Sequence, residues 1–300
     1  MSSRTDSNST DSSSTGSGGA DFLAAMAQAS QQRLAQARAL RPQSELQALA
    51  DALPDPPRLT LSPGGFDLIA EVKLRSPAAG QLKAGSEDIA ARVAHYADAG
   101  AAAISVLTEP SRFDGSLSHL TQAVAGLAGR IPAMRKDFLV DPYQLYEARV
   151  AGAGGVLIIL RMLSRAQIEE LLETAARLRL FVLLEAFDEP DLGLAAQLVR
   201  EYRARATLLV GVNCRDLTTL KVVPGRLEAL AALLPREVPR VAESGVSNPE
   251  DAARLASQGY DVALVGSALM QAADPLVLAA ALLEAGRAGA AGRSAAGGRA

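Results

Sequence analysis

Four short apolar runs of the sequence carry charged residues that could transfer protons. The run FDLIAEVKLRSP contains Glu71 and Lys73 two positions apart, PAMRKDFLVD contains Lys136, LLEA contains Glu185 and VAES contains Glu243. Residues two apart in a strand point to the same side. Lysine and carboxylate side chains are almost never buried without a partner. The pattern therefore indicates a cluster of acid and base groups.

These runs and four others predict the fold. Short β-type apolar runs begin near positions 66, 103, 132, 155, 181, 208, 239 and 262, and amphipathic helical segments lie between them. This alternation predicts parallel strands with right-handed crossovers, and eight units predict an α/β protein with a closed (β/α)8 TIM barrel. An open doubly wound sheet is the alternative, although the usual G-x-G-x-x-G motif after the first strand is missing.

The composition divides the chain into four parts. Residues 1–20 are almost all Ser, Thr, Gly and Asp, which predicts a disordered tail. Residues 21–62 show helical spacing interrupted by Pro42, which predicts an N-terminal helical extension. We assign residues 63–285 to the barrel. Residues 286–300 have few bulky apolar side chains, so we expect a flexible C-terminal tail.

A TIM barrel would bring the charged residues together. Its active site lies at the carboxyl ends of the strands, and alternate strands supply the side chains of one interior layer. The four charged runs are the first, third, fifth and seventh, so we expect their lysines and glutamates to converge in one polar layer. The alternatives are solvated charges in loops and a salt-bridge layer without chemistry.

Polar residues near other strand ends are candidates for substrate contacts. The sixth run, LLVGVNCRDL, ends with Asn213 and Arg215. We favour Asn213 over Arg215 as the direct contact, because Arg215 with Asp216 could simply order the loop. Ser76, in the turn SPAAG, lies close to Lys73 and could reach the same ligand, although a plain turn is the alternative.

Two turns of small residues predict a phosphate site. They are ESGV, with Ser244 and Gly245, and VGSALM, with Gly266 and Ser267. Glycine lets backbone N–H groups approach an anion, and the serines add hydroxyl donors. The loops after the seventh and eighth strands of TIM barrels commonly bind phosphate. Two ordinary glycine turns are the alternative.

The composition argues against several classes of partner. With 30 basic and 33 acidic residues, the formal charge of −3 offers no global attraction to nucleic acid or anionic membranes. One cysteine and two histidines disfavour a disulfide framework and a zinc centre. There is neither a long apolar span nor the apolar core of a signal peptide. We expect a cytoplasmic protein without nucleic-acid, membrane or metal partners.

Several blocks of the sequence carry a resemblance to a known family. AEVK, TEPSRFDGS, RKDFLVDPYQ and GVNCRDL, in consistent order between about residues 22 and 283, resemble the indole-3-glycerol-phosphate synthases of tryptophan biosynthesis. The resemblance implies a carboxy-lyase that closes the ring of 1-(2-carboxyphenylamino)-1-deoxyribulose 5-phosphate, a phosphorylated small molecule. Carbon dioxide and water are lost, and indole-3-glycerol phosphate is formed. No metal or organic cofactor is implied.

The resemblance also implies roles for the charged residues. Lys136 is similar to the general acid that protonates the substrate carbonyl. Lys73 is similar to the residue that holds the substrate carboxylate and donates a proton at dehydration. Glu71 and Glu185 match the carboxylates that pair with these lysines and handle protons. Which carboxylate is the base is left open.

The remaining site residues follow from the same motifs. Asn213 and Glu243 complete the catalytic set, and the residues placed around the substrate are Ser76, Ser244, Gly245, Gly266 and Ser267. Acid and base work near neutral pH predicts lowered lysine pKa values and raised carboxylate pKa values in a crowded, desolvated cluster. The N-terminal helices are expected to cover the barrel mouth and exclude water.

Two other functions compete with this assignment. A related barrel, phosphoribosylanthranilate isomerase, uses a Cys and Asp pair, and this chain has no cysteine at its first strand. A barrel that binds a phosphorylated ligand without turnover would not need Lys73, Lys136 and Glu185 together. We expect a monomer and leave an oligomer open.

Overall fold

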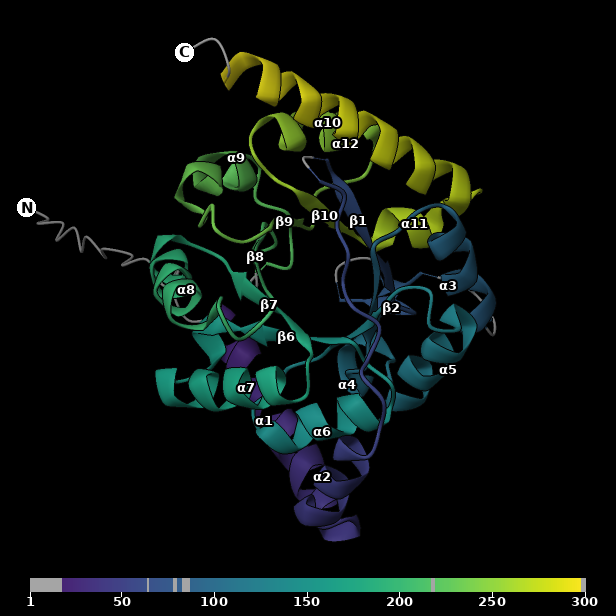
Figure 1. Cartoon of the computed structure of the whole chain (residues 1–300), viewed down its shortest axis with the longest axis vertical. Coiled ribbons are helices and arrows are strands. Elements are labelled where there is room, and N and C mark those ends of the chain that lie inside the picture. Colours follow the sequence, from purple (N-terminus) through teal and green to yellow (C-terminus); the bar gives the residue numbers. More distant parts are fainter. Residues whose placement is uncertain (1–17, 64, 78–79, 83–86, 217–218, 298–300) are drawn as a thin grey trace, which may run out of the picture.

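The computed structural model describes residues 18–63, 65–77, 80–82, 87–216 and 219–297. Its centre is a closed barrel of parallel strands in the order β1-β10-β9-β8-β7-β6-β5-β4, surrounded by helices (Figure 1). The strands are β1 (Asp67–Val72), β4 (Ala103–Leu107), β5 (Ala133–Lys136), β6 (Gly155–Ile159), β7 (Phe181–Ala186), β8 (Leu208–Asn213), β9 (Arg240–Glu243) and β10 (Val262–Val265). The predicted TIM barrel is confirmed, and each strand begins within one residue of its expected start. The open sheet is excluded.

Helices connect the strands and precede the first one. They are α1 (Gly18–Leu40), α2 (Gln43–Asp51), α3 (Ile89–Asp98), α4 (Pro110–Phe113), α5 (Leu117–Leu127), α6 (Pro142–Val150), α7 (Arg165–Arg177), α8 (Glu189–Tyr202), α9 (Arg226–Leu230), α10 (Pro249–Ser257), α11 (Ser267–Gln271) and α12 (Pro275–Gly297), with 3-10 turns η1 (Leu160–Met162) and η2 (Ala231–Leu233). A small antiparallel pair, β2 (Arg75–Ser76) and β3 (Gly80–Gln81), follows β1. Over the described ranges, no helix is both long and apolar enough to cross a membrane.

Capping side chains fix where the crossover helices begin. Asp141 accepts a hydrogen bond from the backbone N–H of Tyr143, and Pro142 occupies the first turn of α6. Ser164 and Gln167 form a reciprocal capping box at the start of α7. Such caps satisfy helix N–H groups that have no partner within the helix. These two caps therefore fix where the segments after β5 and β6 enter their helices.

Two apolar layers lie on the two faces of the strands. Outward side chains such as Leu68, Ala70 and Ile104 pack with the surrounding helices in one core. Inward side chains fill the lower barrel: Ile69, Ala103, Met134, Leu157, Phe181, Leu183, Leu209, Val241, Val262 and Leu264. The charged residues follow these apolar residues along the same inward face, so they lie above an interior that is already filled.

The helical extension contacts both layers. Leu23 and Met26 of α1 belong to the interior cluster together with Phe138 and Phe187, which follow β5 and β7. Leu34, further along α1, packs with the outer core. The extension thus covers the barrel mouth, as expected. The helix α1 begins at Gly18, and residues 1–17 of the predicted N-terminal tail lie outside the described residues.

The predicted C-terminal tail is wrong over residues 286–297, which continue α12 (yellow in Figure 1). A Cβ atom at Gly286 would lie 2.0 Å from Cδ1 of Phe66, and Ala290 is buried. Arg293 Nη2 donates a hydrogen bond to Asp261 Oδ1 at 3.2 Å. The small residues that suggested a tail instead allow the helix to approach the barrel closely.

Two glycines of α12 test this packing. We expect Gly286→Ala to lower the free energy of unfolding by about 1–3 kcal/mol, because the added methyl group overlaps Phe66. Gly292→Ala is the matched control, since nothing lies within 4 Å of its Cβ position. It should raise the stability by about 0.5–1 kcal/mol through helix propensity. Urea unfolding of both variants measures the difference, and equal shifts would contradict the packing of α12.

Candidate active site

Five charged side chains meet inside the upper barrel. Lys136 Nζ lies 3.0 Å from Glu243 Oε2, 3.4 Å from Glu71 Oε2 and 3.8 Å from Glu185 Oε2. Lys73 Nζ lies 2.8 Å from Glu71 Oε1. The three carboxylate residues are at most 3% exposed. The structure therefore brings the predicted polar layer together from β1, β5, β7 and β9, and the alternative of solvated loop charges is wrong.

Two glycines make room for this layer. A Cβ atom at Gly211 would lie 2.2 Å from Glu243 Oε1, and one at Gly266 would lie 2.3 Å from Glu71 Oε1. Any larger residue at either position would displace a carboxylate from its place beside a lysine. Gly211 was not predicted from the sequence, because its importance depends on a side chain of the neighbouring strand.

The pKa shifts of Lys136 and Glu71 correct two expectations. Burial alone would lower the pKa of Lys136, but the carboxylates of Glu243, Glu71 and Glu185 outweigh it and raise this pKa above its ordinary value. Burial alone would raise the pKa of Glu71, but Lys73 and Lys136 lower it to about 2. The expected lowering at Lys136 and the expected raising at Glu71 are both wrong. Both charges are held in their ionised form by close opposite charges.

Glu185 shows the expected behaviour of a buried carboxyl group. Burial raises its pKa well above 4.5, and the nearby carboxylate of Glu243 raises it further, against the opposing charge of Lys136. With a proton on Glu185, the formal charges of the two lysines and the other two glutamates balance. The carboxyl group of Glu185 therefore holds a proton more strongly than an ordinary glutamate does.

An amide connects this layer to the rim. Asn213 Nδ2 donates a hydrogen bond to Glu185 Oε2 at 3.3 Å, and its Oδ1 accepts from Ser244 Oγ at 2.9 Å. The same Oδ1 accepts from the backbone N–H of Arg215 at 3.0 Å. The guanidinium of Arg215 donates to the carbonyl of Leu220 at 2.6 Å, so it does order its loop. Both residues line the cavity, and Asn213 as the direct substrate contact stays a prediction.

A cavity of about 520 Å³ opens above the charged layer. Every predicted site residue lines it except Glu243, which is fully buried below Lys136. One side of the cavity is polar and formed by Ser76, Arg215, Ser244, Gly245, Gly266 and Ser267. Ser244 and Gly245 have φ values of 65° and 73°, a backbone conformation that residues other than glycine adopt only rarely.

Aromatic and aliphatic side chains form another part of the wall. They are Phe22, Leu23, Phe113, Phe138 and Phe187, which together are called the phenyl wall. The ring centroids of Phe22 and Phe138 are 6.0 Å apart, and those of Phe113 and Phe138 are 6.3 Å apart. Sequence analysis missed these residues. Phe138 and Phe187 follow Lys136 and Glu185 by two positions, so the spacing that identified the charges could also have found them.

Comparison with known proteins identifies the family. A family model described as Indole-3-glycerol phosphate synthase matches residues 22–282. The chain belongs to this family. It is 44% identical over 231 residues to the indole-3-glycerol phosphate synthase of Nocardioides sp., a match that covers 76% of this chain and 84% of that protein. It is 41% identical over 219 residues to the multifunctional tryptophan biosynthesis protein of Schizosaccharomyces pombe, covering 72% of this chain and 28% of that protein.

A solved structure supports the fold of this family member independently. The 3-hexulose-6-phosphate synthase of Salmonella typhimurium superposes with a TM-score of 0.55 at 18% identity, covering 74% of this chain and 98% of that one. At this identity the likeness concerns the barrel alone. The indole-3-glycerol phosphate synthase assignment rests on the sequence relatives and the family model.

The pKa of Glu71 is lowered and the pKa of Glu185 is raised, which predicts opposite effects of the two residues on stability. Glu71 has a lowered pKa. Its contribution to the stability of the fold is therefore complete above pH 4.5 and is lost as the pH falls toward 2. We expect Glu71→Gln to lower the free energy of unfolding at pH 7 by roughly 3 kcal/mol, with the deficit shrinking between these two values.

Glu185 has a raised pKa, so wild type loses stability as the pH rises above 4.5. We therefore expect Glu185→Gln to be more stable than wild type at pH 7, with no advantage at pH 4. Denaturant unfolding from pH 3 to pH 8 measures both variants. Parallel pH profiles for the two variants would contradict the charge arrangement.

Proposed function

We propose that this chain is a carboxy-lyase that converts 1-(2-carboxyphenylamino)-1-deoxyribulose 5-phosphate into indole-3-glycerol phosphate. The observation that carries the proposal is the Lys136 ammonium, which lies among three carboxylates at the floor of the cavity. Membership of the indole-3-glycerol phosphate synthase family supports it. A positioned ammonium beside carboxylates is able to give and take protons in one pocket.

The two kinds of cavity wall match the two ends of this substrate. The phenyl wall suits the carboxyphenyl ring, because aromatic rings pack favourably on one another. Ser244, Gly245, Gly266 and Ser267 suit the phosphate, since they line the cavity with small residues that let backbone N–H groups approach an anion. Lys73 also lines the cavity and would hold the substrate carboxylate.

Ring closure is the first step that the site would perform. The ring carbon that bears the carboxylate attacks the C2 carbonyl carbon, and the carbonyl oxygen takes a proton from the Lys136 ammonium. Carbon dioxide then leaves from the same ring carbon, and its bonding electron pair restores the aromatic ring. The neighbouring carboxylates keep Lys136 in its ammonium form, which carries the proton that this step needs.

Dehydration is the second step. The C2 hydroxyl takes a proton from Lys73 and leaves as water, and a carboxylate removes a proton from C1 to form the indole double bond. The leaving water carries two protons that came from the two lysines. The proton removed from C1 replaces one of them. Solvent supplies the other, because the substrate carboxylate departs as neutral carbon dioxide. All of these transfers use side chains of the charged layer.

We assign the base role to Glu185. A carboxylate with a raised pKa is a stronger proton acceptor, and burial with the carboxylate of Glu243 raises the pKa of Glu185 well above 4.5. Glu71, with a pKa of about 2, is a weak proton acceptor and serves to hold Lys73 and Lys136 in place. The electrostatics thus distinguish two carboxylates that the sequence motifs left equivalent.

The competing functions find less support. An isomerase that uses a Cys and Asp pair would need a reactive thiol, and Cys214 is 2% exposed with a pKa raised by burial. A barrel that only captures a ligand would bury these charges without using them. Action as a monomer in the cytoplasm, without a cofactor, stays a prediction from the sequence.

Replacement of Lys136 tests the proposed function. Wild type supplied with the carboxyphenylamino-deoxyribulose phosphate should produce indole fluorescence. Lys136→Met should lower kcat at least about a hundredfold, because the acid for ring closure is lost. Its affinity for product should stay within about tenfold of wild type, because the phosphate contacts are untouched.

The exposed Lys221 provides the control, and Lys221→Met should keep wild-type kcat. Wild type that makes no indole product would overturn the proposed reaction. Unchanged turnover in Lys136→Met would overturn only the role of this lysine. Fluorescence turnover assays and product titration separate the two results.

A further inference from the structure

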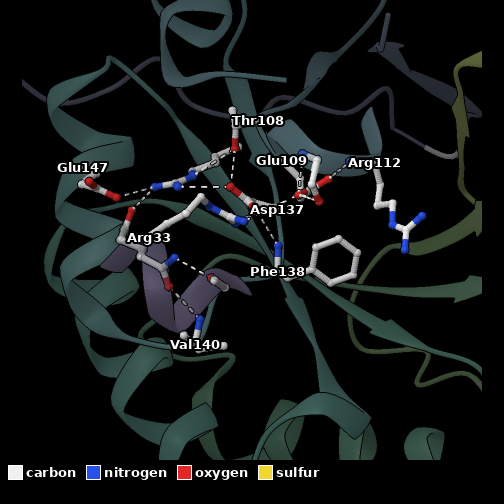
Figure 2. A network of polar contacts seen from close by, with 12 residues as sticks. Arg33, Thr108, Glu109, Arg112, Asp137, Phe138, Val140 and Glu147 are labelled. Atoms are coloured by element: carbon white, nitrogen blue, oxygen red, sulfur yellow. Dashed lines mark hydrogen bonds and ion pairs between the residues drawn. The ribbon is translucent and has the colours of Figure 1, made fainter. Parts of the chain in front are cut away.

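A polar network outside the charged layer joins the helix α1 to the segment that follows Lys136. Arg33 and Ser30 lie three positions apart, on one face of α1. Arg33 Nη2 donates a hydrogen bond to Asp137 Oδ1 at 2.8 Å, and Figure 2 shows its side chain reaching toward that carboxylate. Ser30 is fully buried and its Oγ accepts from Gln144 Nε2 at 2.8 Å.

Asp137 stands at the centre of this network with both carboxylate oxygens fully used. Oδ1 accepts from Arg33 and from the backbone N–H of Phe138 at 2.8 Å. Oδ2 accepts from Thr108 Oγ1 at 2.8 Å and from Arg135 Nη2 at 3.2 Å. The Asp137 side chain is 1% exposed, so each lost donor would leave a buried carboxylate oxygen short of a partner.

The network spans the loops that follow two neighbouring strands. Arg33 Nη1 lies 3.6 Å from Glu109 Oε1, and the Glu109 carboxylate caps α4 by accepting from the N–H groups of Ser111 and Arg112 (Figure 2). Arg33 therefore bridges the loop after β4 and the loop after β5. Both loops carry residues of the phenyl wall, Phe113 and Phe138.

The backbone around Lys136 is held by the same groups. The carbonyl of Lys136 accepts a hydrogen bond from the N–H of Thr108 at 3.1 Å. The next residue is Asp137, whose two carboxylate oxygens both accept hydrogen bonds. Hydrogen bonds at the Lys136 carbonyl and at the Asp137 side chain thus fix the path of the backbone where it leaves β5. Lys136 Nζ must reach three carboxylates from this backbone, so a small rotation at residues 136–138 would move the ammonium away from the reacting oxygen.

We propose that Arg33 is a positioning residue that couples the N-terminal helix to Lys136 through Asp137, so that α1 acts on proton transfer and does more than cover the cavity. The inference rests on the proposed function for its kinetic part. It assigns this role to a residue of α1 that does not itself line the cavity and contacts the lining through Asp137.

A second arginine of α1 provides a matched control. Arg38 Nη2 donates to Asp141 Oδ1 at 2.8 Å, so it also ties α1 to the loop after β5. This pair is more exposed, with side-chain exposures of 42% and 22% against 27% and 1% for Arg33 and Asp137. Exposed pairs contribute little to stability, and Asp141 lies five residues beyond Lys136. Loss of Arg38 therefore loosens the same helix without touching the lysine segment.

The experiment compares Arg33→Met with Arg38→Met. We expect Arg33→Met to lower kcat at least about tenfold while KM stays within about threefold, because the misplaced ammonium affects proton transfer more than binding. Arg38→Met should keep kcat within about twofold of wild type. Equal losses of kcat in the two variants, or an effect of Arg33→Met on KM alone, would overturn the positioning role.

Hydrogen exchange at the Phe138 amide, which donates to Asp137, gives a readout that needs no substrate. It should speed up in Arg33→Met and not in Arg38→Met, and unchanged exchange in Arg33→Met would overturn the coupling. If wild type makes no product, the proposed function fails while this comparison still decides the coupling. If Arg33→Met does not fold, Arg33→Lys keeps one charge without the planar fork and should show a partial loss of kcat. Wild-type kcat in Arg33→Lys would then overturn the proposal.

Discussion

The contact between one buried ammonium and three buried carboxylates is the constraint on which the rest of the structure depends. Each of these ions would be strongly destabilising alone in the barrel interior, since burial of an unpaired charge costs several kcal/mol. Together they stabilise one another, because Lys136 lies within 3.8 Å of all three glutamates and Lys73 pairs with one of them. Burial and the carboxylate of Glu243 raise the pKa of Glu185, whereas the two lysines lower the pKa of Glu71.

The barrel provides the geometry for this cluster through features with no charge of their own. Apolar residues fill the interior below it, and the period of two along each strand brings the next inward residue to the same height. The absence of side chains at Gly211 and Gly266 leaves the volume that the carboxylates of Glu243 and Glu71 occupy. The helix α1 and the phenyl wall limit the access of water, which strengthens every charge interaction inside.

Much of this arrangement could be predicted from the sequence. Strand starts, the closed barrel and the convergence of Lys73, Lys136 and the glutamates follow from local periodicity and from a rule about which strand ends meet. The pKa directions of Lys136 and Glu71 could not be predicted, because they depend on how many opposite charges lie within about 4 Å in three dimensions. Sequence spacing indicated a crowded cluster without giving that number.

Other features escaped prediction because their partners are distant in the chain. Arg33 and Asp137 are separated by 104 positions, and an arginine within an amphipathic helix gives no sign that it will meet a buried carboxylate. The small residues near position 286 were interpreted as a tail. Their role is to allow close contact with Phe66, which lies much earlier in the sequence. In each case the deciding quantity is the space or charge next to the residue in the folded chain.

Heteronuclear NMR of the lysine side chains tests the central charge cluster most directly. The Nζ signal of Lys136, assigned by its absence in Lys136→Met, can be followed as the pH is raised. The account predicts that this ammonium stays protonated beyond the ordinary lysine pKa of 10.5, because three carboxylates hold its charge. A Lys136 signal that titrates at or below 10.5 would contradict the cluster and the role that depends on it.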